Sequence, residues 1–186
     1  MFFKRSVYRV GLLAIAYFAL CHIDNSIMAE SNVGEYQAKT ALIYNFAKLV
    51  QWPDSAFVAN DSPFVFAFLA PDTLGSAPEI IRGKRIHGRV LEVRYYKDVQ
   101  SIRDGNVLFC SPDSLAKVLA DAPAYRNGRH VLTVGQSGDF AERGGMVDLT
   151  FEEDRLAFIV NLVEVRRANL EINANLLDLA AKVIVD

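Results

Sequence analysis

The chain has 186 residues, of which 52% are hydrophobic and 23% are charged. This length is typical of one domain, and this composition excludes a disordered or collagen-like chain. The formal net charge of -2 lacks the basic excess of nucleic-acid-binding proteins, and two cysteines are too few for a disulfide-rich scaffold or a four-thiolate zinc site. The sequence therefore predicts a mildly acidic globular domain.

The first 29 residues have the layout of a secretory signal peptide. Three basic residues precede an uncharged apolar run over residues 10–20, and Ala29 marks the predicted cleavage site. The apolar run is about half the roughly 20 residues that a membrane-spanning helix requires. Two alternatives are an uncleaved anchor and a lipoprotein modified at Cys21. We expect residues 1–29 to be removed on export to the periplasm and residues 30–186 to form the mature domain.

The first predicted element of the mature chain is an amphipathic helix over residues 35–51. Apolar residues recur at helical spacing, and Pro53 ends the helix. Asn45 lies on the same stripe, so we expect its amide to be buried and hydrogen-bonded to neighbouring backbone, with a ligand contact as the alternative. The apolar residues of this predicted buried stripe are Ala38, Ala41, Leu42, Phe46, Leu49 and Val50.

The remaining predicted elements alternate between strands and helices. Continuous apolar runs indicate strands covered on both faces, and the turn at residues 152–154 indicates an antiparallel hairpin. Strands are predicted over residues 63–69, 90–96, 107–110, 130–134, 146–151 and 156–161, and helices over residues 73–81, 111–122 and 174–185. This order predicts a single α/β domain, in which a mixed β-sheet is flanked by helices with Rossmann-like layering, a C-terminal hairpin and a C-terminal helix.

Few groups in the sequence could carry catalysis. There is no dinucleotide- or phosphate-binding glycine motif, and the sequence around Ser137 lacks the second glycine of a nucleophile elbow. His87 and His130 are far apart and have no companions at metal-ligand spacing. Cys110 ends an apolar run and is interpreted as a buried small hydrophobic residue, with intermolecular pairing or reactivity as alternatives. We therefore expect no enzyme activity, no metal site and no cofactor.

Two polar segments are candidate contact surfaces. The basic segment over residues 82–89 is interpreted as a solvated loop, with docking of an acidic partner or an anionic ligand as alternatives. The segment before the predicted last helix has no apolar periodicity of its own, so we expect it to be exposed. Its candidate partner-binding residues are Arg166, Arg167, Asn169 and Glu171, and a solvated loop is the alternative.

Long stretches of the chain resemble the YfiR-type periplasmic family. The similarity begins with EYQAK at residues 35–39 and YNFAKLVQWP at residues 44–53, which together form a long and specific motif. It continues through GK at residues 83–84, GR at 88–89, VLTVG at 131–135, GGMV at 144–147, FIVN at 158–161 and NLLDLA at 175–180. The signature residues, interpreted mainly as fold-defining, are Asn45, Phe46, Lys48, Trp52, Pro53, Gly88, Arg89, Gly144, Gly145 and Asn161.

The resemblance implies a non-enzymatic periplasmic regulator. Such proteins bind the periplasmic sensor part of an inner-membrane diguanylate cyclase and hold it inactive, which lowers cyclic-di-GMP and biofilm formation. The resemblance also implies a homodimer, and an outer-membrane lipoprotein that relieves repression by sequestering the repressor. Some family members form disulfides from cysteine pairs, but the mature chain has Cys110 alone. The alternative from another class is a periplasmic solute-binding protein with a small-molecule cleft at the strand ends, although the mature chain is short for two closing domains.

Overall fold

The computed structural model describes residues 33–69, 74–102, 104–110, 130–152 and 155–186, together with three helical positions at 114, 117 and 120. The chain divides into two compact units, Met1–Tyr36 and Gln37–Asp186. Of the first unit only residues 33–36 are described, and they are helical. The predicted signal peptide, its cleavage site and most of the helix predicted over residues 111–122 lie outside the described residues.

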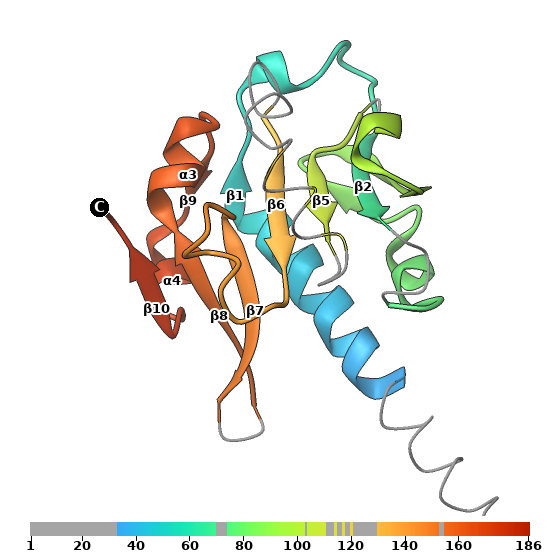
Figure 1. Ribbon diagram of the computed structural model, residues 1–186. Coiled ribbons are helices and arrows are strands. Elements are labelled where there is room, and N and C mark those ends of the chain that lie inside the picture. The colour runs from blue at the N-terminus through green and yellow to red at the C-terminus, as the bar shows by residue number, and fades with distance from the viewer. Residues whose placement is uncertain are drawn as a thin grey trace, which may run out of the picture. The chain divides into compact units, whose positions relative to one another are not determined.

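A mixed β-sheet organises the second unit (Figure 1). Its strands are β2 (Phe64–Leu69), β3 (Arg85–Ile86), β4 (Arg89–Tyr96), β5 (Val107–Phe109), β6 (Leu132–Gly135), β7 (Val147–Glu152), β8 (Arg155–Asn161) and β10 (Lys182–Ile184). Their spatial order is β10-β8-β7-β6-β5-β2-β4-β3. The run from β4 through β2, β5 and β6 to β7 is parallel, and β10 runs parallel to β8. The pairs β7–β8 and β3–β4 are antiparallel, so the predicted mixed α/β sheet with a hairpin near its C-terminal end is confirmed.

The apolar runs recognised in the sequence form the centre of this sheet. All residues of β2 and β5 are buried, as the continuous apolar pattern predicts. Successive side chains of a strand point to opposite faces, so the three phenylalanines of β2 share one face. Ala67 and Leu69 face the other way, into a cluster that includes Phe140 and Cys110. Cys110 is 1% exposed, which confirms the interpretation of its side chain as a buried hydrophobic group.

A helix over residues 37–49 crosses one face of the sheet (Figure 1). Phe46 anchors it by packing edge-on against Phe158 of β8, with ring centroids 4.6 Å apart. The predicted buried stripe is wrong in its rotation about the helix axis, because Ala38, Ala41 and Asn45 are exposed. The expected buried amide of Asn45 is therefore wrong as well.

Polar residues explain this rotation. Lys39 and Thr40 are buried on the true inner face, together with Ile43, Phe46 and Ala47. The ammonium group of Lys39 lies 5.4 Å from the ring centroid of Phe151, so a cation–π contact accompanies its burial. A periodicity based only on apolar residues does not count such side chains and assigns the stripe to a neighbouring face.

A two-stranded ladder follows the helix. The helix ends at residue 49, before its predicted end at residue 51, because Val50–Gln51 form the short strand β1. β1 pairs antiparallel with β9 (Glu171–Ile172) from the far end of the chain. Asn173 N also donates to Leu49 O at 3.2 Å, which continues the contact by one residue on each side.

The C-terminal segment differs from the predicted helix over residues 174–185. Helix α4 covers only Ala174–Leu177, and β10 follows as an edge strand. Residues 182–184 pair with residues 159–161 of β8. Val183 and Ile184 are β-branched and suit a strand, whereas the apolar spacing of the segment also fits a helix.

Further short helices connect the strands in the described ranges. The segment predicted as a helix over residues 73–81 contains the 3-10 helix η2 (Ala77–Ile81). Two other 3-10 helices are η1 (Asp54–Ala56) and η3 (Val99–Ser101). Helix α3 (Leu162–Arg167) begins directly after β8 and lies beside β9 (Figure 1).

Candidate functional site

The segment expected to contact a partner leaves the sheet at the end of β8, where Asn161 fixes its position. Asn161 Oδ1 accepts a hydrogen bond from Glu164 N at 3.1 Å and so caps α3. Its Nδ2 donates to Ala141 O at 2.7 Å and ties the cap to the loop after β6. The side chain is buried, so this signature residue sets where α3 begins and how it sits against that loop.

The four candidate contact residues lie at the end of α3 and just beyond it. Arg166, Arg167, Asn169 and Glu171 are all exposed, as expected, while Ala168 and Leu170 between them are buried. Arg166 and Arg167 belong to the last turn of α3 and Glu171 belongs to β9, so the segment is more regular than the solvated loop given as the alternative. Buried residues on either side hold the exposed groups at fixed positions.

The two arginines of this segment differ in their contacts. Arg167 donates to Glu164 Oε1 at 2.6 Å. The Arg166 side chain forms no hydrogen bond or ion pair with any residue in the part of the chain that the structure describes. Asn169 adopts a left-handed backbone conformation with φ of +53°, which asparagine tolerates better than most residues. The segment therefore presents at least one cation that is available to a partner.

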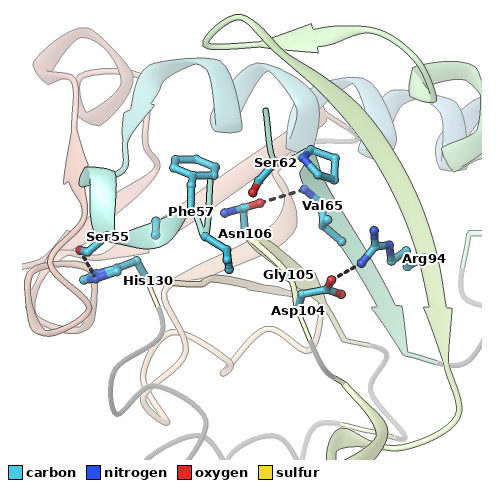
Figure 2. A pocket seen from close by; sticks show the side chains of 12 residues that line it. Ser55, Phe57, Ser62, Val65, Arg94, Asp104, Gly105, Asn106 and His130 are labelled. Carbon is cyan, nitrogen blue, oxygen red and sulfur yellow. Dashed lines mark hydrogen bonds and ion pairs between the residues drawn. The ribbon is translucent and has the colours of Figure 1, made fainter. Parts of the chain in front are cut away.

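A cavity of about 320 Å³ opens at the amino ends of β2, β5 and β6 (Figure 2). Ser55, Phe57 and Ser62 line it from the segment between β1 and β2, and Arg94 lines it from β4. Asp104 and Asn106 come from the residues before β5, and His130 comes from those before β6. The lining mixes hydroxyl, amide, imidazole and charged groups with one aromatic ring.

His130 connects the cavity to the candidate contact segment. Its Nδ1 lies 2.8 Å from Ala168 O, and its Nε2 lies 2.9 Å from Ser55 Oγ. A carbonyl oxygen only accepts, so Nδ1 donates, and in the neutral imidazole Nε2 accepts from the Ser55 hydroxyl. The backbone carbonyl of His130 accepts from Trp52 Nε1 at 2.9 Å. One histidine therefore joins η1, the start of β6 and the turn after α3.

Arg94 occupies the opposite end of the cavity in Figure 2. It donates to Glu92 Oε2 at 2.5 Å and also pairs with Asp104. Asp104 accepts a further hydrogen bond from the Tyr96 hydroxyl at 2.8 Å. The hydrogen bond to Asp104 is the main reason why the pKa of Arg94 is raised above its ordinary value. This cation is held between two carboxylates.

Asn106 lies between these two ends. Its Oδ1 accepts from Val65 N at 2.8 Å, and its own backbone N donates to Val65 O at 2.8 Å. The residue is only 6% exposed, so the first bond fixes which way the amide points. Figure 2 shows the amide nitrogen directed away from Val65.

The arginine side chains of the basic segment over residues 82–89 already form hydrogen bonds or ion pairs within the protein. Arg89 Nη1 donates to the carbonyls of residues 59, 60 and 62 at 2.8–3.0 Å, and its guanidinium lies 3.7 Å from the ring centroid of Phe57. Arg85 donates to the carbonyl of Gly88 at 2.6 Å, and Gly88 has a positive φ of +81°. Arg82 pairs with Glu79 at 2.6 Å. These contacts leave the segment few free donors for an acidic partner.

Other signature residues also lie at structural positions. Trp52 packs edge-on against Phe64 with centroids 4.9 Å apart, and Pro53 precedes η1 as its N-cap. A Cβ added at Gly145 would lie 2.0 Å from the ring of Phe140, and Gly144 has a φ of +95°. Lys48 and Asn45 are the exceptions, because both are exposed on the N-terminal helix.

Sequence comparison decides the family. A family model described as YfiR/HmsC-like matches residues 36–181. The chain belongs to the YfiR/HmsC-like family. This membership confirms the resemblance drawn from the helix signature, and the family consists of regulatory proteins that are not known as enzymes. No curated protein matches the chain.

Solved structures add a distant likeness in fold. A conserved domain protein from Vibrio cholerae O1 biovar El Tor strain N16961 is 12% identical, with a TM-score of 0.53 over 80% of this chain and 60% of that chain. An ABC domain in complex with L-Trp from Streptococcus pneumonia is 10% identical, with a TM-score of 0.43 over 70% of this chain and 57% of that chain. The chain thus spans about three fifths of the length of either structure. The first likeness concerns the fold alone, and the second is too weak to support an argument.

Among the described ranges, no helix has the length and the apolar character needed to cross a bilayer.

Proposed function

We propose that this protein is a periplasmic regulator that binds the sensor part of an inner-membrane diguanylate cyclase and holds it inactive. Membership of the YfiR/HmsC-like family is the observation that carries the proposal. Repression lowers cyclic-di-GMP and with it biofilm formation. The protein acts as a homodimer after removal of its signal peptide, and an outer-membrane lipoprotein relieves the repression.

The contact surface in this proposal is the segment with Arg166, Arg167, Asn169 and Glu171. To shift the cyclase from 1:99 to 99:1 in favour of its inactive state, the protein must bind that state about 5.5 kcal/mol more tightly than the active one. A polar surface supplies such a difference when a few anchor residues dominate, and arginine is a frequent anchor. Arg166 is exposed and has no partner among the described residues, which supports this choice.

The test combines a gene deletion with charge reversals. We expect deletion to raise cyclic-di-GMP per cell, and Arg166→Glu and Arg167→Glu each to reproduce part of that rise at normal periplasmic protein level. Arg155→Glu is the matched control, because Arg155 is an exposed arginine at the opposite end of β8. Unchanged cyclic-di-GMP in the deletion strain contradicts the repressor function. Silent reversals at both arginines contradict only the surface.

Export is tested separately. Mass spectrometry of the mature N-terminus is expected to show a chain that begins at Glu30. A chain that still begins at Met1 in the cytoplasm contradicts both the periplasmic location and the proposed contact with a periplasmic sensor domain.

A further inference from the structure

The cavity at the amino ends of β2, β5 and β6 has no role in the proposed partner contact. We propose that it is a binding site for a small, neutral, polyhydroxylated ligand of the size of a monosaccharide. The proposal goes beyond the repressor function, because it concerns the binding of a small molecule and does not depend on the cyclase.

The first argument is the size of the cavity and the fixed positions of residues that line it. A volume of about 320 Å³ lies at the lower end of the roughly 300–1,000 Å³ typical of ligand sites. Five separate segments of the chain contribute to the lining, and two of its side chains are fixed by hydrogen bonds to backbone: Asn106 to Val65 N and His130 to Ala168 O. The shape is therefore set before any ligand arrives, which limits the entropic cost of binding.

The second argument is charge. Arg94 is the cation of the lining, and it is already paired with Asp104 and Glu92. Asp104, the carboxylate of the lining, accepts from both Arg94 and the Tyr96 hydroxyl. A phosphate or carboxylate ligand would have to compete with these carboxylates for Arg94, and an ammonium ligand would have to compete with Arg94 for them. Neutral ligands bind without breaking either pair.

The third argument is the set of hydrogen-bonding groups. The Asn106 Nδ2 group is a donor on the cavity side of the amide (Figure 2). Ser62 Oγ accepts from Ala59 N at 2.9 Å, so its hydroxyl hydrogen is left to donate. Ser55 gives its hydrogen to His130, so its oxygen is left to accept. A ligand that meets donors and acceptors on one lining needs groups that do both, and hydroxyl groups have this property.

Phe57 supplies the apolar complement. Its ring is half-buried and lines the cavity, and the Arg89 guanidinium beneath it restricts its movement. A pyranose ring offers a face of C–H groups that can pack on such an aromatic wall while its hydroxyl groups reach the polar residues. Sugars and cyclic polyols are therefore the class of ligand that this lining fits.

The experiment is a titration of the full mature protein, followed by backbone amide NMR. The neutral probes are glucose, galactose, N-acetylglucosamine and myo-inositol, and the charged counterparts are glucose 6-phosphate, glucuronate and glucosamine. We expect at least one neutral probe to give saturable shifts centred on residues 55–65, 104–106 and 130, with a Kd of about 10 mM or lower. Absence of saturation with every neutral probe, or tighter binding of a charged counterpart, overturns the proposal.

Two variants test the site itself. Asn106→Asp keeps the acceptor for Val65 N but replaces the cavity-side donor with a carboxylate oxygen, so binding is expected to weaken about tenfold or more. Asn45→Asp adds the same charge on the exposed helix and is expected to bind like the wild type. Ser62→Ala removes a second donor and is also expected to weaken binding. It tests the site if Asn106→Asp does not fold. Wild-type affinity in the folded variants overturns the proposal, whereas unchanged cyclic-di-GMP in a deletion strain contradicts the repressor function and leaves the titration unaffected.

Discussion

Two segments of this chain have similar basic composition and are used in opposite ways. In the segment over residues 82–89, Arg89 donates to three backbone carbonyls and stacks on Phe57, and its neighbours Arg82 and Arg85 are also engaged. In the segment over residues 166–171, Arg166 points to solvent without a partner in the described part of the chain. A cluster of positive charge in a sequence therefore does not indicate a docking surface by itself.

The difference follows from what surrounds each segment. Gly88 turns the chain with a positive φ just before Arg89, which brings the guanidinium beneath the loop over residues 59–62, to whose carbonyls it donates. Arg166 instead lies in the last turn of a capped helix, where the backbone is already hydrogen-bonded and the side chain extends outward. Arg89 is needed to donate to nearby backbone carbonyls, whereas the backbone around Arg166 is already hydrogen-bonded and leaves that side chain free.

The largest effect that tests this comparison is expected at Arg89. Arg89→Ala removes the donor to three carbonyls and the contact with Phe57, so we expect the free energy of unfolding to fall by about 2–3 kcal/mol. Arg82→Ala is the control, because it breaks one exposed pair with Glu79 and should cost about 0.5 kcal/mol or less. Urea unfolding of both variants measures the difference. Equal losses would mean that Arg89 is no more structural than Arg82.

The exposed segment depends on one buried side chain, Asn161. Asn161→Ala removes the cap of α3 and leaves Ala141 O without its donor, so we expect a loss of about 1–3 kcal/mol in unfolding free energy. Asn173→Ala is the matched control, since Asn173 caps the short helix α4 at an exposed position. Repression should also weaken in Asn161→Ala if α3 carries the contact surface. If Asn161→Ala is less stable but still represses as strongly as the wild type, Asn161 stabilises the fold without supporting the contact surface.

The loop that Asn161 braces is also held by Asp148. This carboxyl is fully buried and accepts from Phe140 N at 3.0 Å, and burial is the main reason why its pKa is raised above the ordinary value. Because this pKa is higher in the folded state, the native protein binds more protons than the unfolded chain. The contribution of Asp148 to stability is therefore fully present below its unfolded-state pKa and is lost as pH rises through its folded-state pKa. We expect the unfolding free energy of the wild type, relative to that of Asp148→Asn, to be higher near pH 4 than at pH 7. Parallel pH profiles in urea unfolding would contradict this.

The smallest expected effect on stability is at the proposed surface. Arg166→Glu has no intramolecular contact to break among the described residues, whereas Arg167→Glu breaks a pair whose carboxylate partner, Glu164, is buried. Arg166→Glu should change the unfolding free energy by about 0.5 kcal/mol or less, and Arg167→Glu should cost more, because it places a second negative charge beside the buried Glu164 carboxylate. Thermal or urea unfolding beside the cyclic-di-GMP measurement checks this. A loss as large as that of Arg89→Ala would place Arg166 with the structural arginines.

The sequence was sufficient for elements whose pattern is local. The all-apolar runs of β2 and β5 predict strands that are buried on both faces. The alternation of β4 predicts a strand that is buried on one face. The helix phase was wrong because Lys39 and Thr40 are buried by tertiary contacts that composition does not show. The C-terminal helix was wrong because β10 depends on pairing with β8, and an edge strand of three residues has too little pattern to outweigh a helical spacing.

The candidate sites show the same limit. The exposure of Arg166, Arg167, Asn169 and Glu171 is predicted because the segment lacks apolar periodicity, but the burial of Ala168 and Leu170 between them is not. The Ser55–His130–Ala168 contacts were not predicted, since only the sheet topology brings these three residues together. Asn106 is a missed signal of a different kind, because a polar amide directly before a buried strand often serves to satisfy neighbouring backbone. The cavity could not be inferred from any single segment.

The short ladder between β1 and β9 has a consequence for the order in which the molecule assembles. It joins Val50 to Ile172, so nearly the whole domain lies in the loop that this contact closes. Closing a longer loop costs more chain entropy, and contacts of large sequence separation are rewarded only after others have formed. The neighbouring last turn of α3, which carries the exposed arginines, therefore reaches its final position late in folding. Newly made protein should acquire its central sheet before it acquires the surface proposed to recognise the cyclase.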